Sequence, residues 1–148
     1  MPEAAMIVPN LRVADMARAL AFYQDFLGLT LSFAVAADRS MLAETDGSDA
    51  VFATLDWNGA RLMLQTAESL AAELSVFALV ADNAAAPGSP DAAIYFQGFD
   101  PDAVLQRVPP EAVVTGPVTQ WYGMRELYLR DPDGHILCLG IADGPAPG

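Results

Sequence analysis

The sequence is poor in cysteine, in basic residues and in long apolar runs, and each shortage excludes a class of protein. One cysteine among 148 residues excludes an intramolecular disulfide and is typical of a reducing compartment. Only seven Lys and Arg stand against 19 Asp and Glu. Phosphate binding needs clustered basic side chains, so we expect no nucleic-acid partner.

No apolar run approaches the roughly 18 residues that a membrane helix needs. The start of the chain, MPEAAMIV, has neither the basic residues nor the cleavage pattern of a secretory signal. These two observations predict a cytoplasmic protein that does not enter a membrane.

Apolar residues are abundant, at 53% of the chain, which is enough for one domain or for two small modules that share a core. The net charge of −12 would attract cationic small molecules. Charge of this sign also simply keeps a protein in solution, and the composition does not separate the two interpretations.

Residues 121–140, WYGMRELYLRDPDGHILCLG, carry the clearest local pattern. Pro132 presets φ for a tight turn, Asp131 is placed to accept bonds from the amides that follow, and Gly134 tolerates the left-handed conformation. The pattern predicts a hairpin with a type I turn and a bulge. In its register Asp131 faces His135, Leu129 faces Leu137 and Leu127 faces Leu139.

This hairpin should have two unlike faces. One is apolar and should be covered by a helix; it consists of Leu127, Leu129, Leu137, Leu139 and Ile141. The other is mixed and consists of Glu126, Tyr128, Arg130, Ile136, Cys138 and Gly140. A sheet face that only meets water usually carries more charge, so the mixed face indicates the wall of a pocket.

Periodicity and turn residues divide the rest of the chain into short elements. We expect strands at 5–13, 29–36, 50–57, 60–66, 92–99 and 112–118, and helices at 16–27, at 68–80 and from Pro101 to the Pro109-Pro110 pair. Asp15 and Gly28 are the expected caps of the first helix, and Asn58-Gly59 is a hairpin turn. Residues 38–49 read as a loop or an irregular ribbon, and 83–90 as a flexible linker.

The order strand–helix–strand–strand–strand therefore occurs twice, which indicates an α+β fold built from an internal repeat. The modules are predicted at 1–66 and 92–148, joined by a helical linker at 67–91.

The chain resembles the glyoxalase/bleomycin-resistance superfamily, also called the vicinal oxygen chelate superfamily. The resemblance rests on VPNLRVADMARALAFYQDFLGL, on ARLMLQ and on WYGMRELYLRDPDGHILCLG, together with the repeat. It implies two βαβββ modules that form a cupped half-barrel, and a homodimer. It does not fix a function, because the superfamily hosts many.

Metal-using members of the superfamily draw ligands from the first and last strands of each module. The matching positions here are Val8, Gln65, Ala93 and Cys138. Two of the four have no donor atom, and a weak amide oxygen with a lone thiolate does not complete a site. We therefore expect no metal and no other cofactor, and no catalytic residue is assigned.

The resemblance favours the branch related to bleomycin resistance, in which a drug-like molecule is sequestered without chemistry, as in antibiotic resistance. Aromatic residues at the mouth of the cup would stack on a flat ligand, and Glu126 would pair with a ligand cation. The predicted ligand-binding residues are Asn10, Gln65, Tyr95, Trp121, Glu126, Tyr128 and Cys138.

Several of these residues have a structural alternative. Trp121 would pack over a sheet edge, Glu126 would pair with Arg61 or Arg130, and Cys138 would be a small buried apolar residue. Two other functions also remain open. One is a metal-dependent lyase, isomerase or dioxygenase with a ligand set that includes Glu126 or His135. The other is an interaction module without a ligand.

Overall fold

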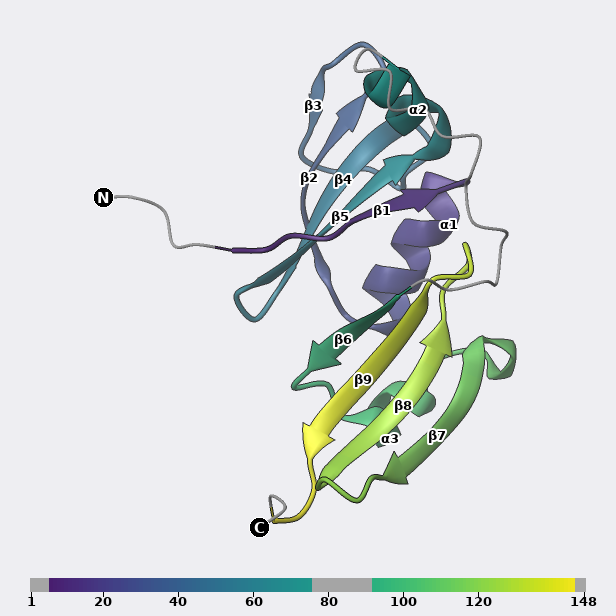
Figure 1. The fold of residues 1–148 in the computed structure, drawn as a ribbon. Helices are drawn as coiled ribbons and strands as arrows, with labels where there is room; N and C mark the ends of the chain where they lie inside the picture. The colour runs from purple at the N-terminus through teal and green to yellow at the C-terminus, as the bar shows by residue number, and fades with distance from the viewer. Residues whose placement is uncertain (1–5, 76–91, 146–148) are drawn as a thin grey trace. The chain divides into compact units, whose positions relative to one another are not determined.

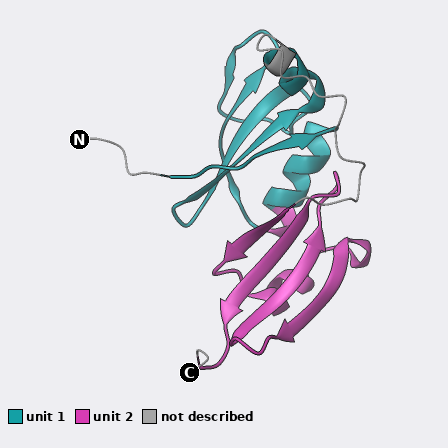
Figure 2. Ribbon diagram, in the orientation of Figure 1, with its two compact units in different colours: residues 1–24, 28–81 teal, residues 25–27, 82–148 magenta. Residues whose placement is uncertain are grey.

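The structure, a computed structural model, describes residues 6–75 and 92–145 and contains two compact units (Figure 1, Figure 2). Unit 1 consists of residues 1–24 and 28–81, and unit 2 of residues 25–27 and 82–148. Each unit has its own sheet and its own helix on one face of that sheet.

Unit 1 holds a five-stranded sheet in the order β1-β5-β4-β2-β3. Its strands are β1 (Asn10–Val13), β2 (Thr30–Ala36), β3 (Met41–Leu42), β4 (Ala50–Trp57) and β5 (Ala60–Thr66), and its helices are α1 (Met16–Ala21) and α2 (Ala67–Ser75). β1 runs parallel to β5, and the other pairs are antiparallel. The side chains of Ala53, Leu55 and Leu64, fully buried on the α1 side, form the core of this unit.

The first helix begins where the sequence predicts but changes its winding. The Asp15 side chain accepts a bond from the Arg18 amide, which confirms the predicted N-cap. The α-helix ends at Ala21, and a π-helix, Phe22–Phe26, completes the segment up to Gly28, whose φ is +78°. The expectation of one regular helix over 16–27 is therefore wrong. The wider π-turn lies where two adjacent aromatic residues are both buried, which a period of 3.6 does not anticipate.

The hairpin of β4 and β5 has the predicted bounds, because Asn58 and Gly59 both adopt positive φ, at 47° and 85°. One other expectation in this unit needs correction, because the strand expected at 5–13 begins only at Asn10. The segment 38–49, expected to be a loop or irregular ribbon, contains the two-residue strand β3. Pairing with a neighbouring strand, which local sequence does not reveal, sets both boundaries.

Unit 2 holds a four-stranded sheet in the order β6-β9-β8-β7. Its strands are β6 (Ala93–Gln97), β7 (Val113–Thr119), β8 (Met124–Arg130) and β9 (Ile136–Ala142), with helix α3 (Pro101–Leu105) and the 3₁₀ helix Pro110–Ala112. β6 runs parallel to β9, and the other pairs are antiparallel. Asp100 caps α3 and Pro101 starts it, as predicted. The helix ends at Leu105, before the Pro109-Pro110 pair, and Pro110 instead begins the 3₁₀ turn.

The predicted β8–β9 hairpin is confirmed. Leu127 pairs with Leu139 and Leu129 with Leu137, and the Asp131 amide donates to the His135 carbonyl at 2.9 Å. The Asp131 carboxylate accepts from two amides of the turn, and Gly134 has a φ of 89°. The four leucines are fully buried beneath α3. Ile141, expected on the same apolar face, is 38% exposed.

In both sheets the first strand of the unit lies beside the last, and the strand before the last comes next. This shared order confirms the α+β fold of two βαβββ modules, with β3 as an addition to unit 1. Both sheets are open, with different strands at their two edges. The cup predicted from both modules together stays a prediction. Residues 76–80 of the second predicted helix and the predicted linker at 83–90 lie outside the described residues.

None of the helices within 6–75 and 92–145 is both long and apolar enough to cross a bilayer.

Candidate functional site

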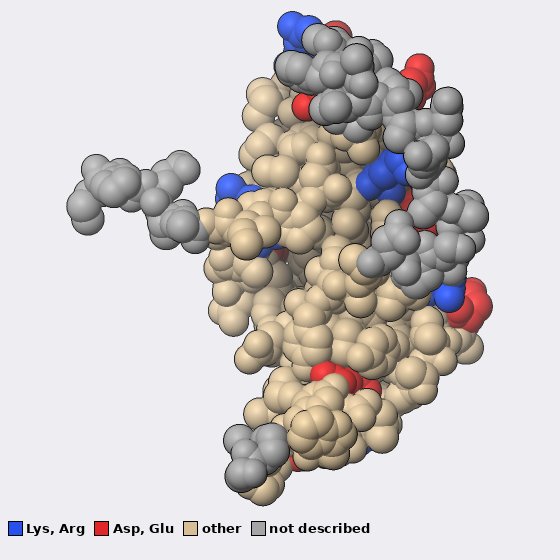
Figure 3. Space-filling model, viewed as in Figure 1, with Lys and Arg blue, Asp and Glu red and all other residues tan. Residues whose placement is uncertain are grey.

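The predicted site residues of β8 and β9 lie on the sheet face of unit 2 opposite α3. Residues paired across antiparallel strands share a face, so Glu126 lies beside Gly140, and Tyr128 beside Cys138. α3 lies behind the strands in Figure 1, so this face is the one seen there. In Figure 3 the surface over unit 2 is mostly uncharged, with a few acidic groups.

Glu126 is the centre of this face. The residue is 1% exposed, and its carboxylate accepts a hydrogen bond from the Tyr122 hydroxyl. The Tyr95 hydroxyl also interacts with this carboxylate. Arg61 pairs with Asp56 instead, and within the described residues no ion pair joins Glu126 to Arg61 or Arg130. A buried carboxylate is costly unless donors surround it, and here the donors are neutral hydroxyl and thiol groups.

The carboxylate contributes to a raised pKa of both phenols. The hydrogen bond to Glu126, followed by partial burial and the Glu126 charge, raises the pKa of Tyr122 to about 12. The pKa of Tyr95 is raised well above its usual value, first by burial of the hydroxyl and then by the bond to Glu126. Both hydroxyls therefore act as hydrogen-bond donors at neutral pH, and neither is poised to act as a base.

Gly140 makes room for Tyr95. A Cβ placed on Gly140 would lie 2.0 Å from the Tyr95 hydroxyl oxygen and 2.7 Å from the ring carbon that carries it. Gly140 is also the cross-strand partner of Glu126. Tyr95 therefore crosses β9 through the space of a missing side chain to reach the carboxylate on β8.

Cys138 and Tyr128 form a second pair on the same face. Burial raises the pKa of the Cys138 thiol to about 11, and the Tyr128 hydroxyl shares a hydrogen bond with it. The thiol is thus protonated at neutral pH, and a nucleophilic cysteine needs the opposite shift. The pair shapes the face without supplying a reactive group.

Trp121 is 83% exposed, so it does not pack over the sheet edge as the structural alternative proposed. Its ring meets the Tyr122 ring edge to face, with the ring centroids 5.3 Å apart. This contact places an exposed indole next to the phenol that holds Glu126.

The predicted residues of unit 1 form a separate network. The Gln65 side chain, 5% exposed, accepts a bond from the Asn10 amide at 2.9 Å. Its own amide donates to Ser69 at 3.1 Å and to the Glu73 carboxylate at 2.8 Å, both on α2. Both donors of Gln65 are thus used inside the unit, which joins β1, β5 and α2.

The residues expected at the metal positions do not fit a metal ion. Val8 and Ala93 carry no donor, Gln65 is engaged by its own unit, and Cys138 alone offers a single thiol. Within the described residues no group of three or more His, Cys, Asp and Glu side chains comes close enough to hold an ion. Glu126 and His135, considered for an alternative ligand set, join no such group in that part of the chain.

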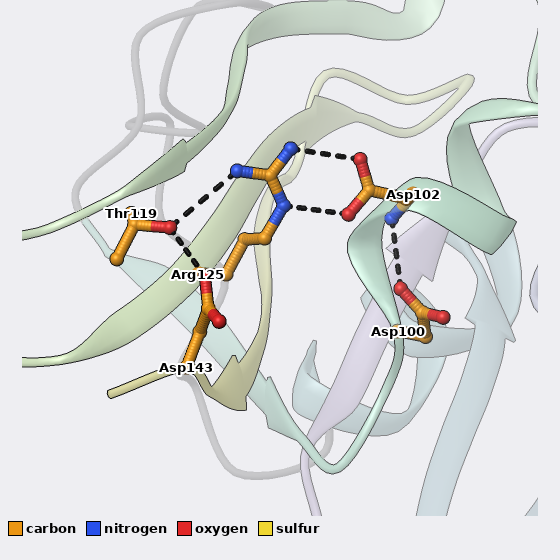
Figure 4. Close-up of polar contacts among 5 residues, drawn as sticks. All are labelled: Asp100, Asp102, Thr119, Arg125 and Asp143. Atoms are coloured by element: carbon orange, nitrogen blue, oxygen red, sulfur yellow. Dashed lines mark hydrogen bonds and ion pairs between the residues drawn. The ribbon is translucent and has the colours of Figure 1, made fainter. Parts of the chain in front are cut away.

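A further polar cluster lies at the edge of unit 2 (Figure 4). Arg125 forms a two-pronged ion pair with Asp102 of α3, at 2.5 and 2.8 Å. The Thr119 hydroxyl donates to Asp143 at 2.6 Å and lies 3.4 Å from the Arg125 guanidinium. These groups satisfy one another and fasten α3 to the sheet.

The structure thus brings four of the predicted residues together in unit 2, namely Tyr95, Glu126, Tyr128 and Cys138, with Trp121 beside them, and places Asn10 and Gln65 in unit 1. Two residues of the unit 2 site, Tyr122 and Gly140, were not predicted as such. Tyr122 follows Trp121 in a turn, where periodicity gives no side-chain direction. The role of Gly140 depends on a tyrosine 45 positions earlier in the chain, since 140 − 95 = 45.

The sequence matches a known protein-family model. This is the family model of the glyoxalase/bleomycin resistance protein/dioxygenase superfamily, and it matches residues 5–139. No curated protein matches significantly.

Similar solved structures show the same fold. A protein of unknown function from Agrobacterium tumefaciens is 24% identical, with a TM-score of 0.67, over 96% of this chain and 97% of that one. TioX from Micromonospora sp. ML1 is 18% identical, with a TM-score of 0.66, over 94% and 99%. A glyoxalase/bleomycin resistance protein/dioxygenase from Nocardioides is 18% identical, with a TM-score of 0.62, over 100% and 90%. At these identities the likeness concerns the fold alone.

Proposed function

Since the chain belongs to the glyoxalase/bleomycin resistance protein/dioxygenase superfamily, we propose that it binds and sequesters a small organic molecule that carries an aromatic ring and a cationic group. The site is the sheet face of unit 2 around Glu126. The carboxylate receives the cation, and the aromatic residues near it, Tyr95, Trp121, Tyr122 and Tyr128, receive the ring.

The observation that supports this proposal is a carboxylate at 1% exposure whose partners are neutral donors. A buried charge without a counter-charge lowers stability, and such a cost is found mainly where function requires it. The tyrosine rings beside it add cation–π attraction for a positive group. The net charge of −12 acts in the same direction at longer range.

The protonation states favour binding over catalysis. General-base or nucleophilic chemistry needs a group whose pKa is brought towards neutrality. The shifts of Tyr122, Tyr95 and Cys138 all move the other way. We therefore propose that a bound molecule leaves unchanged.

The test is titration of the protein with aromatic amines and their neutral analogues, by calorimetry and by quenching of tryptophan fluorescence. Glu126→Gln should weaken binding of the cationic compounds by more than about tenfold, because it removes the buried charge. Glu111→Gln is the matched control, since Glu111 is an exposed glutamate of the same unit and its loss changes the net charge equally.

Mass spectrometry of the ligand after incubation separates binding from turnover. Recovery of the unchanged compound supports sequestration. A product formed in proportion to time and protein would overturn it in favour of an enzyme. Equal binding by Glu126→Gln and the unmodified protein would remove Glu126 from the site.

We further propose that the protein is a cytoplasmic homodimer that binds no nucleic acid, which rests on its composition and on the superfamily. Sedimentation at micromolar concentration measures the oligomeric state directly.

A further inference from the structure

Two tyrosines hold the Glu126 carboxylate, and they differ in how firmly they are placed. Tyr122 donates a hydrogen bond to Oε1 of Glu126, and its ring also contacts Trp121. Tyr95 belongs to β6, an edge strand that pairs only with β9 in the sheet of unit 2. Tyr95 is 44% exposed although its hydroxyl reaches a buried carboxylate. Of the two, Tyr95 is the more exposed residue, and its ring can turn towards solvent.

Gly140 provides a slot for Tyr95 and is not needed for its own backbone shape. Its φ lies outside the left-handed region, so any residue could adopt its conformation. A Cβ there would meet the Tyr95 hydroxyl at 2.0 Å, so it is the contact between Tyr95 and Glu126 that requires glycine. Residue 140 thus carries no side chain at the position where the Tyr95 phenol crosses β9.

We propose that Tyr95 is an exchangeable cap on Glu126, and that the ligand replaces the Tyr95 hydroxyl with an N–H group of its own. This inference rests on the proposed function and narrows its ligand class. The cation is a protonated primary or secondary amine, or an amidinium, and a quaternary ammonium is rejected.

The ligand needs an N–H group because the buried Glu126 carboxylate must keep its hydrogen bonds when the ligand binds. While Tyr95 is in place, the carboxylate accepts from Tyr122, and the Tyr95 hydroxyl lies beside it over Gly140, the cross-strand partner of Glu126. A ligand that turns Tyr95 outward must supply another donor. A buried charged group that loses a hydrogen bond is otherwise destabilised, because water does not replace the lost donor. A quaternary ammonium brings the charge but no donor. An aromatic cage alone would accept both cations equally well.

A matched series of probes tests the ligand class on the intact protein. The probes are 1-naphthylmethylammonium, its N,N,N-trimethyl analogue and 1-naphthylmethanol, which share the ring and differ in charge and in donors. Calorimetry should give the tightest binding for the ammonium, with the trimethyl analogue about tenfold weaker or more, as expected for the loss of a charged hydrogen bond. Equal binding of the two cations overturns this inference and leaves the proposed function intact. Failure of all three probes to bind overturns both.

Variants test the cap itself. Tyr95→Phe removes the group that must be displaced, so affinity for 1-naphthylmethylammonium should rise about fivefold, the value of one modest hydrogen bond. Tyr122→Phe removes the other phenol from the same carboxylate and should give no such rise, because Tyr122 stays in place when the ligand binds. A rise in both variants, or in neither, contradicts the exchange.

Gly140→Ala tests the same contact by a change on β9, the strand next to the one that carries Tyr95. The added methyl group excludes the Tyr95 hydroxyl from its slot, so the affinity should rise as it does in Tyr95→Phe, and the double variant should show no further gain. Circular dichroism and thermal melting establish that each variant is folded. If Gly140→Ala does not fold, Tyr95→Phe with its Tyr122→Phe contrast decides the question alone.

Discussion

Both units place one long polar side chain on the sheet face away from the core leucines: Gln65 on β5 in unit 1 and Glu126 on β8 in unit 2. Gln65 is neutral, and its donors and acceptor are matched by Asn10, Ser69 and Glu73. Glu126 is an acceptor only, and phenols and a thiol surround it without a cation. An amide of this kind can be saturated by its own unit, whereas a carboxylate keeps its charge however many neutral donors it receives.

The difference separates a structural polar centre from one suited to a ligand. The Gln65 network joins three elements and leaves no donor of that amide for another molecule. The Glu126 cluster retains a charge that nothing in the described part of the unit neutralises. Substitutions that remove the polar group should therefore have opposite effects in the two units.

Gln65→Met should give the largest change in stability. Methionine has a similar length but returns none of the three hydrogen bonds, so the free energy of unfolding should fall by about 2 kcal/mol. Denaturant unfolding measures this loss, and the helix signal should fall because α2 loses its attachment to β5. An unchanged midpoint would mean that solvent replaces the network at no cost.

Glu126→Met should act in the opposite direction and by a smaller amount. It removes a buried charge that lacks a counter-ion, while the freed phenols of Tyr95 and Tyr122 can turn to water, so stability should rise by about 1 kcal/mol. The same denaturant titration detects the gain, and ligand binding should be lost with it. A clear loss of stability would show that hydrogen bonds from the phenols fully offset the free-energy cost of burying the carboxylate.

The smallest expected effect is the fall in stability at alkaline pH that the ionisable groups of unit 2 cause. The fold raises the pKa of Cys138 to about 11 and that of Tyr122 to about 12, which favours the protonated forms of both groups. Their contribution is complete below the unfolded values, near 9 and 10, and is lost as the pH rises through the folded ones. Denaturant midpoints measured from pH 8 to pH 11 should therefore fall.

The fall should be shallower in Cys138→Ala and Tyr122→Phe. Gln65→Met should keep the full slope, since Gln65 is held by Asn10, Ser69 and Glu73 and by neither of these two groups. Equal slopes in all four proteins would mean that other groups control the alkaline limit.

Local chemistry fixes much of the fold. Asn58-Gly59 sets the β4–β5 hairpin, Asp131 and Gly134 set the β8–β9 register, and Asp15 and Asp100 mark the helix starts. Each signal acts within about five residues, so the sequence alone reveals it. The π-turn after Ala21 escapes prediction because the burial of two adjacent aromatic residues, rather than a period, decides it.

The candidate site is less accessible to such reasoning. Alternation along β8 and β9 places Glu126, Tyr128 and Cys138 on one face, which the structure shows. The partners of Glu126 depend on parallel pairing of β6 with β9 and on the space at Gly140, neither of which has a local signature. Gln65 was expected to face a ligand, but the structure shows both of its donors bound to α2, and only the tertiary position of that helix reveals this.

The pairing of the first strand with the last has a consequence for how each unit is assembled. Asn10 pairs with Met63 and Tyr95 with Cys138, so the partners are 63 − 10 = 53 and 138 − 95 = 43 residues apart. During synthesis β1 and β6 leave the ribosome well before their partners, whereas each terminal hairpin can close at once. The hairpins should therefore form early, and the leading strands should join last, as the slow step that long-range contacts impose.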